Sequence, residues 1–229
     1  MCGRFVGYRN LEELRQHFPI DVADCEVAAS YNVAPTQQVL AIVRRDNLNV
    51  LDRFHWGLVP FWARETAIGH KMINARSETI ASKPSFRNAF IKRRCLIPAD
   101  GFFEWKTIKG KKQPVFVTLP DETPFAFAGL WETWQNRKEP EAPYRSCTII
   151  TREAEGAVRE IHHRMPVIVS PAAYQTWLAP ENRDTTHLRD IITRQAITDL
   201  VFRPVSTQVN NPRTNQPSNI RHVQTEFDF

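Results

Sequence analysis

A succession of short apolar runs, separated by turn-forming residues, most constrains how this chain can fold. The runs are rich in β-branched and aromatic residues and lie at residues 39–43, 49–59, 125–131, 147–151 and 165–169. Short runs of this composition predict strands that are at least half buried. Because helical segments interrupt them without a regular alternation, we predict an α+β fold with largely antiparallel sheets.

Two pairs of runs predict hairpins. A turn at Asp46-Asn47 joins the first two runs. Residues 95–106 ("CLIPADGFFEWK") and 113–119 ("QPVFVTL") predict a second hairpin, whose tip is the basic stretch "TIKGKK". Neighbours in the sequence therefore lie side by side in both pairs, as an antiparallel sheet requires.

Four segments predict helices, at residues 10–18, 84–93, 170–178 and 184–194. The first begins at Asn10, and Glu13 completes a capping-box pattern. Pro84 favours the start of the second helix, and Ser170 is expected to cap the third.

No internal repeat and no long flexible linker divides the chain. The loosest segment, residues 135–143 ("QNRKEPEAP"), is polar and punctuated by proline, which is typical of a surface loop rather than of a domain boundary. We therefore predict one domain over residues 1–229 and expect it to act as a monomer.

Composition narrows the class of protein. No stretch approaches the roughly 18 apolar residues of a membrane span, and the N-terminus lacks the layout of a signal peptide, so we expect a cytoplasmic protein. The net charge of +5 favours a polyanionic partner such as nucleic acid. The four cysteines are far apart and form no C-x-x-C pair, which argues against a zinc site. We expect no metal and no cofactor.

The sequence begins "MCGRF", and its second residue is a cysteine. General rules of N-terminal processing favour removal of Met1 when a small residue follows it. The mature chain would then begin with Cys2, whose α-amine and thiol stand on adjacent carbons. An internal cysteine cannot offer that pair, although a partly buried thiol without a function is the simpler interpretation.

Three further stretches place polar or ionisable groups between apolar residues. They contain Asn74 and Arg76 in "INARSET", Glu104 in "DGFFEWK", and His162 with Arg164 in "IHHRMP". Each has an ordinary interpretation when taken alone: a turn amide, a solvent-facing carboxylate, a loop histidine or a surface charge. In a strand, Glu104 would lie on the face opposite its aromatic neighbours.

Taken together, these motifs resemble the SOS response-associated peptidase family, also called SRAP domains or abasic-site processing proteins. The matching motifs occur in the family's order over nearly the whole chain. They are "MCGR", "YNVAPTQ", "WGLVPFWA", "INARSET", "IPADGFFEW", "KQP", "TIIT", "IHHRMPVIV" and "VSTQVNN".

The resemblance implies that the antiparallel sheets form a pseudo-barrel with helices around it. It also implies a protein that traps abasic sites in single-stranded DNA covalently and shields them from strand cleavage. It assigns the attacking group to Cys2 and the supporting catalytic roles to Asn74, Glu104 and His162. It also implies peptidase-like self-processing at Cys2. The residues that the resemblance and the local pattern place on DNA are Gly3, Arg4, Phe61, Trp62, Arg76 and Arg164.

The chemistry suits these groups. An α-amine adds to the aldehyde of a ring-opened abasic sugar, and the thiol beside it closes a thiazolidine ring. Two alternatives remain open: an amidohydrolase or peptidase whose nucleophile is the Cys2 thiolate, and a non-covalent single-stranded DNA-binding module in which Cys2 is structural. The basic charge and the aromatic-arginine stretch "PFWAR" favour DNA over peptide.

Overall fold

The computed structural model describes residues 2–136 and 143–224. Most of the predicted surface loop at residues 135–143 therefore lies outside the described residues. Among them, no helix is both apolar enough and long enough to cross a membrane.

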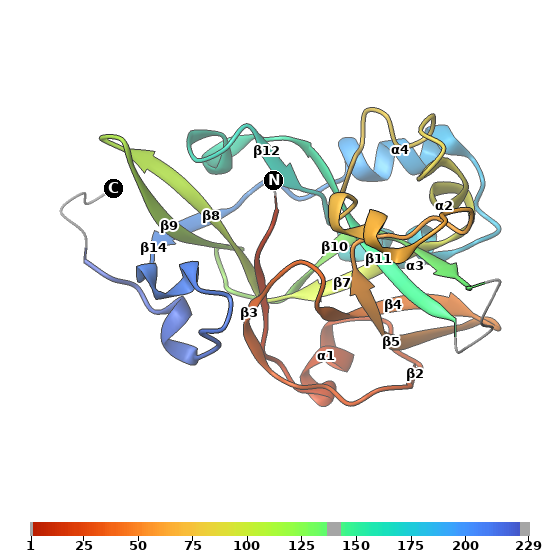
Figure 1. The fold of residues 1–229 in the computed structure, drawn as a ribbon, viewed down its shortest axis with the longest axis horizontal. Coiled ribbons are helices and arrows are strands. Elements are labelled where there is room, and N and C mark those ends of the chain that lie inside the picture. Colours follow the sequence, from red (N-terminus) through yellow and green to blue (C-terminus); the bar gives the residue numbers. More distant parts are fainter. Residues whose placement is uncertain (1, 137–142, 225–229) are drawn as a thin grey trace.

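Two largely antiparallel sheets form the framework of the molecule (Figure 1). The smaller sheet has the strand order β14-β9-β8-β1-β3. Its strands are β1 (Phe5–Gly7), β3 (Ser30–Val33), β8 (Gly101–Ile108), β9 (Lys111–Thr118) and β14 (Val201–Pro204).

The larger sheet follows the order β12-β11-β10-β7-β4-β5-β2, while β13 pairs with β10 and β6 pairs with β11. Its strands are β2 (Val22–Ala23), β4 (Gln38–Arg45), β5 (Leu48–Trp56), β6 (Asn74–Arg76), β7 (Arg94–Ala99), β10 (Phe125–Trp134), β11 (Tyr144–Glu153), β12 (Arg164–Pro166) and β13 (Ile168–Val169). The pairs β11–β5, β11–β6 and β2–β5 are parallel.

Both sheets contribute to one apolar core. Phe5 and Phe102 of the smaller sheet lie 5.7 Å and 6.1 Å from Phe127 of the larger sheet, measured between ring centroids. Edge contacts between aromatic rings add to the stabilisation from burying their surface. The two sheets thus enclose shared side chains, and the predicted α+β class with largely antiparallel sheets is confirmed.

Helices cover the other face of the larger sheet. Alternation along β4 directs Ala41 and Val43 into the shared core and Ile42 into a second apolar cluster, where it packs with Leu14 and Trp177 of the helices. The α-helices are α1 (Leu11–His17), α2 (Arg87–Lys92), α3 (Tyr174–Leu178) and α4 (Thr185–Thr193). The 3-10 helices are η1 (Thr66–Lys71), η2 (Gly156–Glu160), η3 (Pro171–Ala173), η4 (Thr207–Asn210) and η5 (Pro217–Ile220).

Several local predictions are confirmed. The capping box of α1 is present, because Glu13 N donates to Asn10 Oδ1 at 3.0 Å and Asn10 N donates to Glu13 Oε2 at 2.9 Å. The turn between β4 and β5 consists of Asp46 and Asn47, with φ angles of 49° and 65°. Two consecutive positive φ angles are the signature of the tight hairpin turn that asparagine and aspartate tolerate.

Three local predictions are wrong. Helix α2 begins at Arg87 rather than at Pro84, because residues 83–86 form a turn first. Ser170 makes no side-chain capping bond, and a 3-10 turn precedes α3. The third error concerns only the bounds of the second hairpin, which is itself confirmed as the antiparallel pair β8–β9. Its first arm is shorter than predicted, because β7 ends before Asp100 and β8 begins after it in the other sheet.

Gly57 and Gly69 approach each other closely at the two ends of the loop that carries the exposed Phe61 and Trp62. Gly57 has a φ of +138°, and a Cβ on it would lie 2.6 Å from the carbonyl oxygen of Gly69. We expect Gly57→Ala to lower the free energy of unfolding by about 2–4 kcal/mol, because it adds backbone strain to a steric clash. Denaturant unfolding measures this loss. Gly7→Ala is the control, since its Cβ would meet no heavy atom closer than 3.9 Å; an equal loss in both variants would contradict the explanation.

Candidate active site

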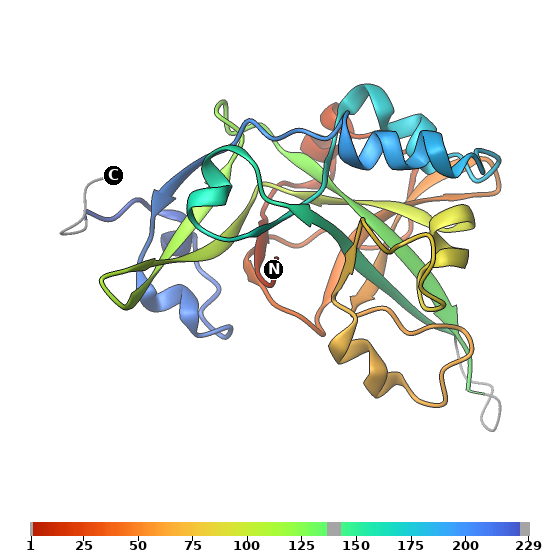
Figure 2. The ribbon, with the colours of Figure 1, turned by 90° about the horizontal axis from the view of Figure 1, so that it is seen from above.

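The N-terminal segment extends the smaller sheet along β8. Phe5 pairs with Phe102, and Phe103 N donates to Arg4 O at 2.9 Å. Continuing this antiparallel register places Gly3 opposite Glu104. In both ribbon views the N-terminal segment that leads into β1 lies near the middle of the long axis, beside the β8–β9 hairpin (Figures 1 and 2).

Cys2 is fully buried, and Asn74 contacts its backbone. Asn74 Nδ2 donates to Cys2 O at 2.8 Å, whereas the buried Asn74 Oδ1 accepts no hydrogen bond within the described part of the chain. Burial, assisted by the negative charge of Glu104, raises the pKa of the Cys2 thiol well above its usual range. Cys2 therefore carries a neutral thiol close to both Asn74 and Glu104.

The position of Asn74 is determined by its neighbour along the chain. The carbonyl of Ile73 accepts hydrogen bonds from Trp56 Nε1 at 2.9 Å and from Ile149 N at 3.1 Å. Asn74 itself begins β6, which pairs in parallel with β11. The motif "INARSET" thus forms a short strand that presents its amide to the N-terminal segment.

Glu104 has the environment of an acid–base group. It lies on β8 and is only 4% exposed. Burial raises its pKa to about 7, although the positive charge of Lys112 acts in the opposite direction. A carboxyl with this pKa is present in both protonation states near neutral pH, which suits proton transfer in either direction.

His162 stands between η2 and β12. Its Nδ1 lies 2.9 Å from Arg164 N and 3.1 Å from Arg164 O, and it accepts from Arg164 N in the tautomer that carries the proton on Nε2. Burial lowers the pKa of His162, which favours this neutral form. His163 stacks on the ring with centroids 4.3 Å apart. The positive charge of Lys112 acts to lower the pKa of both His162 and Glu104.

The predicted DNA-binding arginines differ in their surroundings. Arg76 is exposed at the end of β6. Arg164 is buried and forms a bidentate ion pair with Glu78, at 2.6 Å and 3.0 Å, while its Nη2 also donates to Thr151 O at 2.8 Å. Arg4 is half buried, and its Nη1 donates to acceptors within the protein. Only Arg76 of the three presents its guanidinium openly.

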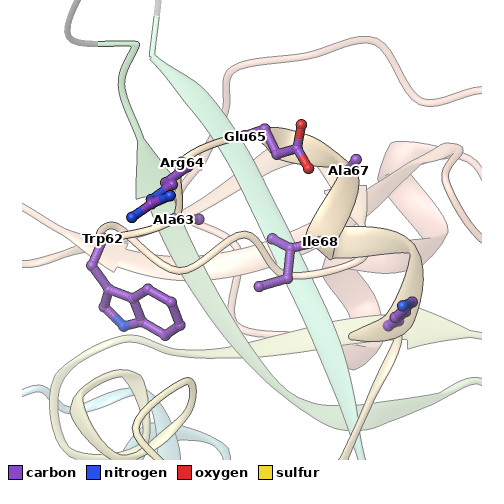
Figure 3. Close-up of a pocket in the computed structure, with 7 residues that line it drawn as sticks. Trp62, Ala63, Arg64, Glu65, Ala67 and Ile68 are labelled. Atoms are coloured by element: carbon purple, nitrogen blue, oxygen red, sulfur yellow. The ribbon is translucent and has the colours of Figure 1, made fainter.

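Phe61 and Trp62 are the predicted stacking residues, and they are 51% and 45% exposed. Trp62 forms one edge of an open pocket of about 530 Å³, opposite Ile68 of η1 (Figure 3). Trp134 Nε1 donates to Ala63 O at 2.8 Å and holds this loop against β10. Large exposed aromatic side chains beside a concave surface are typical of a binding site.

Several residues of this region were not predicted from the sequence. Glu78 follows Arg76 by two positions, and only the paired Arg164 reveals its role. The pocket wall adds Arg64, Glu65, Ala67, Ile68 and Lys71. The mixture of basic and apolar residues in "RETAIGHK" was the available signal. Across residues 2–136 and 143–224, no group of three or more His, Cys, Asp or Glu side chains is placed to hold a metal ion.

The buried Glu104 predicts a dependence of stability on pH. Since its pKa is raised to about 7 in the folded protein, the folded state binds more protons than the unfolded state between pH 4.5 and 7. The contribution of this group to stability therefore falls as pH rises through that window, by about 2–3 kcal/mol in all. Denaturant unfolding at pH 5 and pH 8 should show a smaller pH-dependent loss in Glu104→Gln than in the parent. An unchanged pH dependence in the variant would contradict the buried carboxyl.

The comparisons with known proteins agree on one family. A sequence model described as SOS response associated peptidase (SRAP) matches residues 1–212. The chain belongs to the SRAP family. Abasic site processing protein YoqW of Bacillus subtilis is 42% identical to this SRAP chain over 221 residues, covering 95% of this chain and 97% of YoqW. Abasic site processing protein YoaM of the same organism is 42% identical over 218 residues, covering 94% and 95%.

Solved structures show the same fold. A crystal structure of a protein from Bacteroides thetaiotaomicron superposes on this SRAP chain with a TM-score of 0.82, covering 98% of this chain and 100% of that chain. Their sequence identity is 24%, so this likeness shows the fold alone. The two-sheet architecture is therefore that of other solved proteins.

Proposed function

We propose that this SRAP-family protein processes abasic sites in DNA by capturing them covalently on Cys2 after removal of Met1. The relatives YoqW and YoaM, named abasic site processing proteins, support the choice of substrate. The observation that carries the chemistry is the burial of Cys2 beside Glu104, whose pKa is raised to about 7. A nucleophile and a proton-transfer group are thus adjacent in a site with little water.

The α-amine of Cys2 suits attack at neutral pH. An amine adds to an aldehyde only when it is neutral, and an α-amine with an ordinary pKa is roughly a tenth to a fifth neutral at pH 7. A lysine side chain is neutral to only a few parts in ten thousand, so the chain terminus has an advantage of several hundredfold over lysine. Removal of Met1 is therefore the enabling step, and the peptidase-like self-processing implied by the family resemblance would supply it.

The reaction balances without a cofactor. The amine adds to the C1′ aldehyde to give a carbinolamine, and the carbinolamine loses its hydroxyl as water after receiving a proton from Glu104. The Cys2 sulfur then adds to the carbon of the protonated imine, and the thiol proton returns to the Glu104 carboxylate. Aldehyde and aminothiol thus give a thiazolidine and one water. Ring closure is intramolecular, and it removes the imine that would promote β-elimination and strand cleavage.

Asn74 and His162 assist as neutral partners. Asn74 holds the Cys2 carbonyl, and its buried Oδ1 is an acceptor that can orient the terminal amine or a sugar hydroxyl. His162 offers an Nε2 proton to the hydroxyl released when the sugar ring opens. Gly3 has no side chain, which lets the sugar approach the backbone beside Glu104.

The DNA strand is expected to lie across the exposed residues around this site. Arg76 supplies a phosphate contact, and Phe61 with Trp62 stacks an unpaired base. Arg164 would bind a phosphate by releasing the Glu78 carboxylate. The exchange is possible because a carboxylate and a phosphate both accept two parallel hydrogen bonds from a guanidinium. Contacts of this kind recognise the backbone and the missing base and read little sequence. We propose that residues 1–229 act as one domain on single-stranded DNA.

A thiol peptidase acting on other proteins is the second candidate, and the structure favours it less. Such an enzyme needs the Cys2 thiolate, whereas burial raises the pKa of this thiol. Capture of an aldehyde starts from the amine and tolerates a neutral thiol until ring closure.

Intact mass spectrometry tests the proposal. The protein should first show the mass of a chain without Met1. After incubation with an abasic single-stranded oligonucleotide, it should show the combined mass of protein and DNA minus one water. An intact oligonucleotide of the same sequence and a peptide mixture are the controls. Absence of an adduct, or equal adducts with damaged and intact DNA, would overturn the proposed function.

A further inference from the structure

The N-terminal segment is held more firmly than a chain end normally is. Three hydrogen-bonded positions fix residues 2–4: Cys2 O on Asn74, Arg4 O on Phe103 N, and the Arg4 guanidinium. The contact of Cys2 O lies in the candidate site, and the contact of Arg4 O is with β8. The third position leads away from the site, into the interior of the protein.

Arg4 is fixed by two acceptors at one nitrogen. Its Nη1 donates to Asn32 Oδ1 at 2.7 Å and to Val209 O at 2.8 Å. Its guanidinium also lies 5.8 Å from the ring centroid of Trp105, whose Nε1 donates to Asn210 Oδ1 at 2.7 Å. The side chains of Arg4 and Trp105 therefore both bind η4. These contacts join the N-terminal segment to a part of the chain that is 205 residues away in sequence.

Asn32 is the buried centre of this connection. It lies on β3 and is 1% exposed. Its Nδ2 faces three backbone carbonyls, with oxygen atoms 3.2 Å, 3.1 Å and 2.7 Å away, from Val209, Asn211 and Thr214. Because only an amide N–H can face carbonyl oxygens favourably, the orientation of the amide is unambiguous, and Oδ1 must point at Arg4.

We propose that Asn32 is a positioning residue for the capture reaction: through Arg4 it holds the amine and thiol of Cys2 in place beside Glu104. The inference rests on the proposed function of Cys2. It assigns the Arg4 side chain to an internal supporting contact, in contrast to the DNA contact predicted from the sequence. A terminal amine that moves freely would have to be ordered in each reaction, and a misplacement of about 1 Å can cost a hundredfold in rate.

The chain offers a matched control for local damage. Asn219 is also fully buried, and its Nδ2 donates to Thr214 O at 2.6 Å and to Tyr31 O at 3.4 Å. It therefore supports the same segment as Asn32 without contacting Arg4. Asn219→Ala should loosen that segment while leaving the hydrogen bond between Arg4 and Asn32 in place.

Single-turnover capture of an abasic oligonucleotide separates positioning from DNA binding. We expect Asn32→Ala and Arg4→Lys to lower the rate at saturating DNA by about 10- to 100-fold. The half-saturating DNA concentration should change by less than about twofold, because Lys keeps the charge and Asn32 does not reach solvent. Asn219→Ala should capture at the parental rate. The double variant Arg4→Ala/Asn32→Ala should capture no more slowly than Arg4→Ala, because both substitutions remove the same interaction between Arg4 and Asn32.

Amide hydrogen exchange gives a second measurement that needs no DNA. Asn32→Ala should reduce the protection of the amides of residues 3–5 by about tenfold or more relative to the parent, and Asn219→Ala should not. A rise in half-saturating DNA concentration at an unchanged maximal rate would overturn the inference, as would equal losses in the two asparagine variants. If the parent itself captured no DNA, the proposed function would fail, and hydrogen exchange would still decide whether Asn32 orders the N-terminus.

Discussion

Replacement of Cys2 by alanine is expected to abolish the heat-stable adduct with abasic single-stranded DNA. General N-terminal processing also removes Met1 before alanine, which is a small residue. The alanine variant therefore has an α-amine that can add to the aldehyde, even without self-processing at position 2. It cannot close the thiazolidine ring, because closure needs the sulfur on the adjacent carbon. The imine that remains is hydrolysed on heating or promotes strand cleavage. Denaturing electrophoresis after heating should show free DNA or cleaved DNA, with at least about 100-fold less adduct than for the parent.

Two further cysteine variants separate the roles of the amine and the thiol. Cys2→Ser should give an adduct only when borohydride reduces the imine in place. Cys25→Ser should behave as the parent, because Cys25 is a half-buried cysteine whose Sγ lies 3.8 Å from Leu51 O. A heat-stable adduct in Cys2→Ala would show that another group captures the sugar. Thermal unfolding of each variant checks that the fold survives.

Features with local causes could be predicted from the sequence. The capping box of α1 joins residues three apart, and the turn at Asp46-Asn47 joins strands that are adjacent in the chain. The division of residues 95–106 at Asp100 could not be predicted in this way. The Asp100 carboxylate accepts hydrogen bonds from Tyr8 N at 2.7 Å and from Arg9 Nε at 2.8 Å, both some ninety residues distant in sequence.

The same division applies to the candidate site. Strand alternation correctly places Glu104 on the face of Phe102 and away from Phe103, since Phe102 lies in the shared core and Phe103 in a separate cluster. Its burial depends on the N-terminal segment that lies against β8, so the exposed carboxylate that a lone strand predicts is wrong.

The hydrogen-bond partners of the arginines could not be predicted from the sequence. Arg164 pairs with Glu78 across a separation of 86 residues, and Arg4 pairs with Asn32 across 28. A residue type and its motif indicate that an arginine can bind an anion. They do not indicate which acceptor inside the protein already occupies it.

Glu104→Gln is expected to slow capture at saturating abasic DNA by about 100-fold, because general acid catalysis typically contributes that much or more. Glutamine keeps the size of the side chain and its hydrogen-bonding capacity, yet it cannot give a proton to the carbinolamine hydroxyl. Glu132→Gln is the matched control. Glu132 is a second buried glutamate, 5% exposed, that pairs with Arg93 at 2.7 Å. Its variant should capture at the parental rate.

The pH profile of the same reaction distinguishes an acid from a structural carboxyl. In the parent the neutral fraction of the amine rises with pH, while the protonated fraction of Glu104 falls as pH passes about 7. The product of these two fractions gives a bell-shaped profile near neutral pH. In Glu104→Gln the falling limb should vanish, and the rate should rise with pH until the amine is fully neutral. A variant that retains the falling limb would assign the acid to another group, and His162 would then be the next residue to substitute.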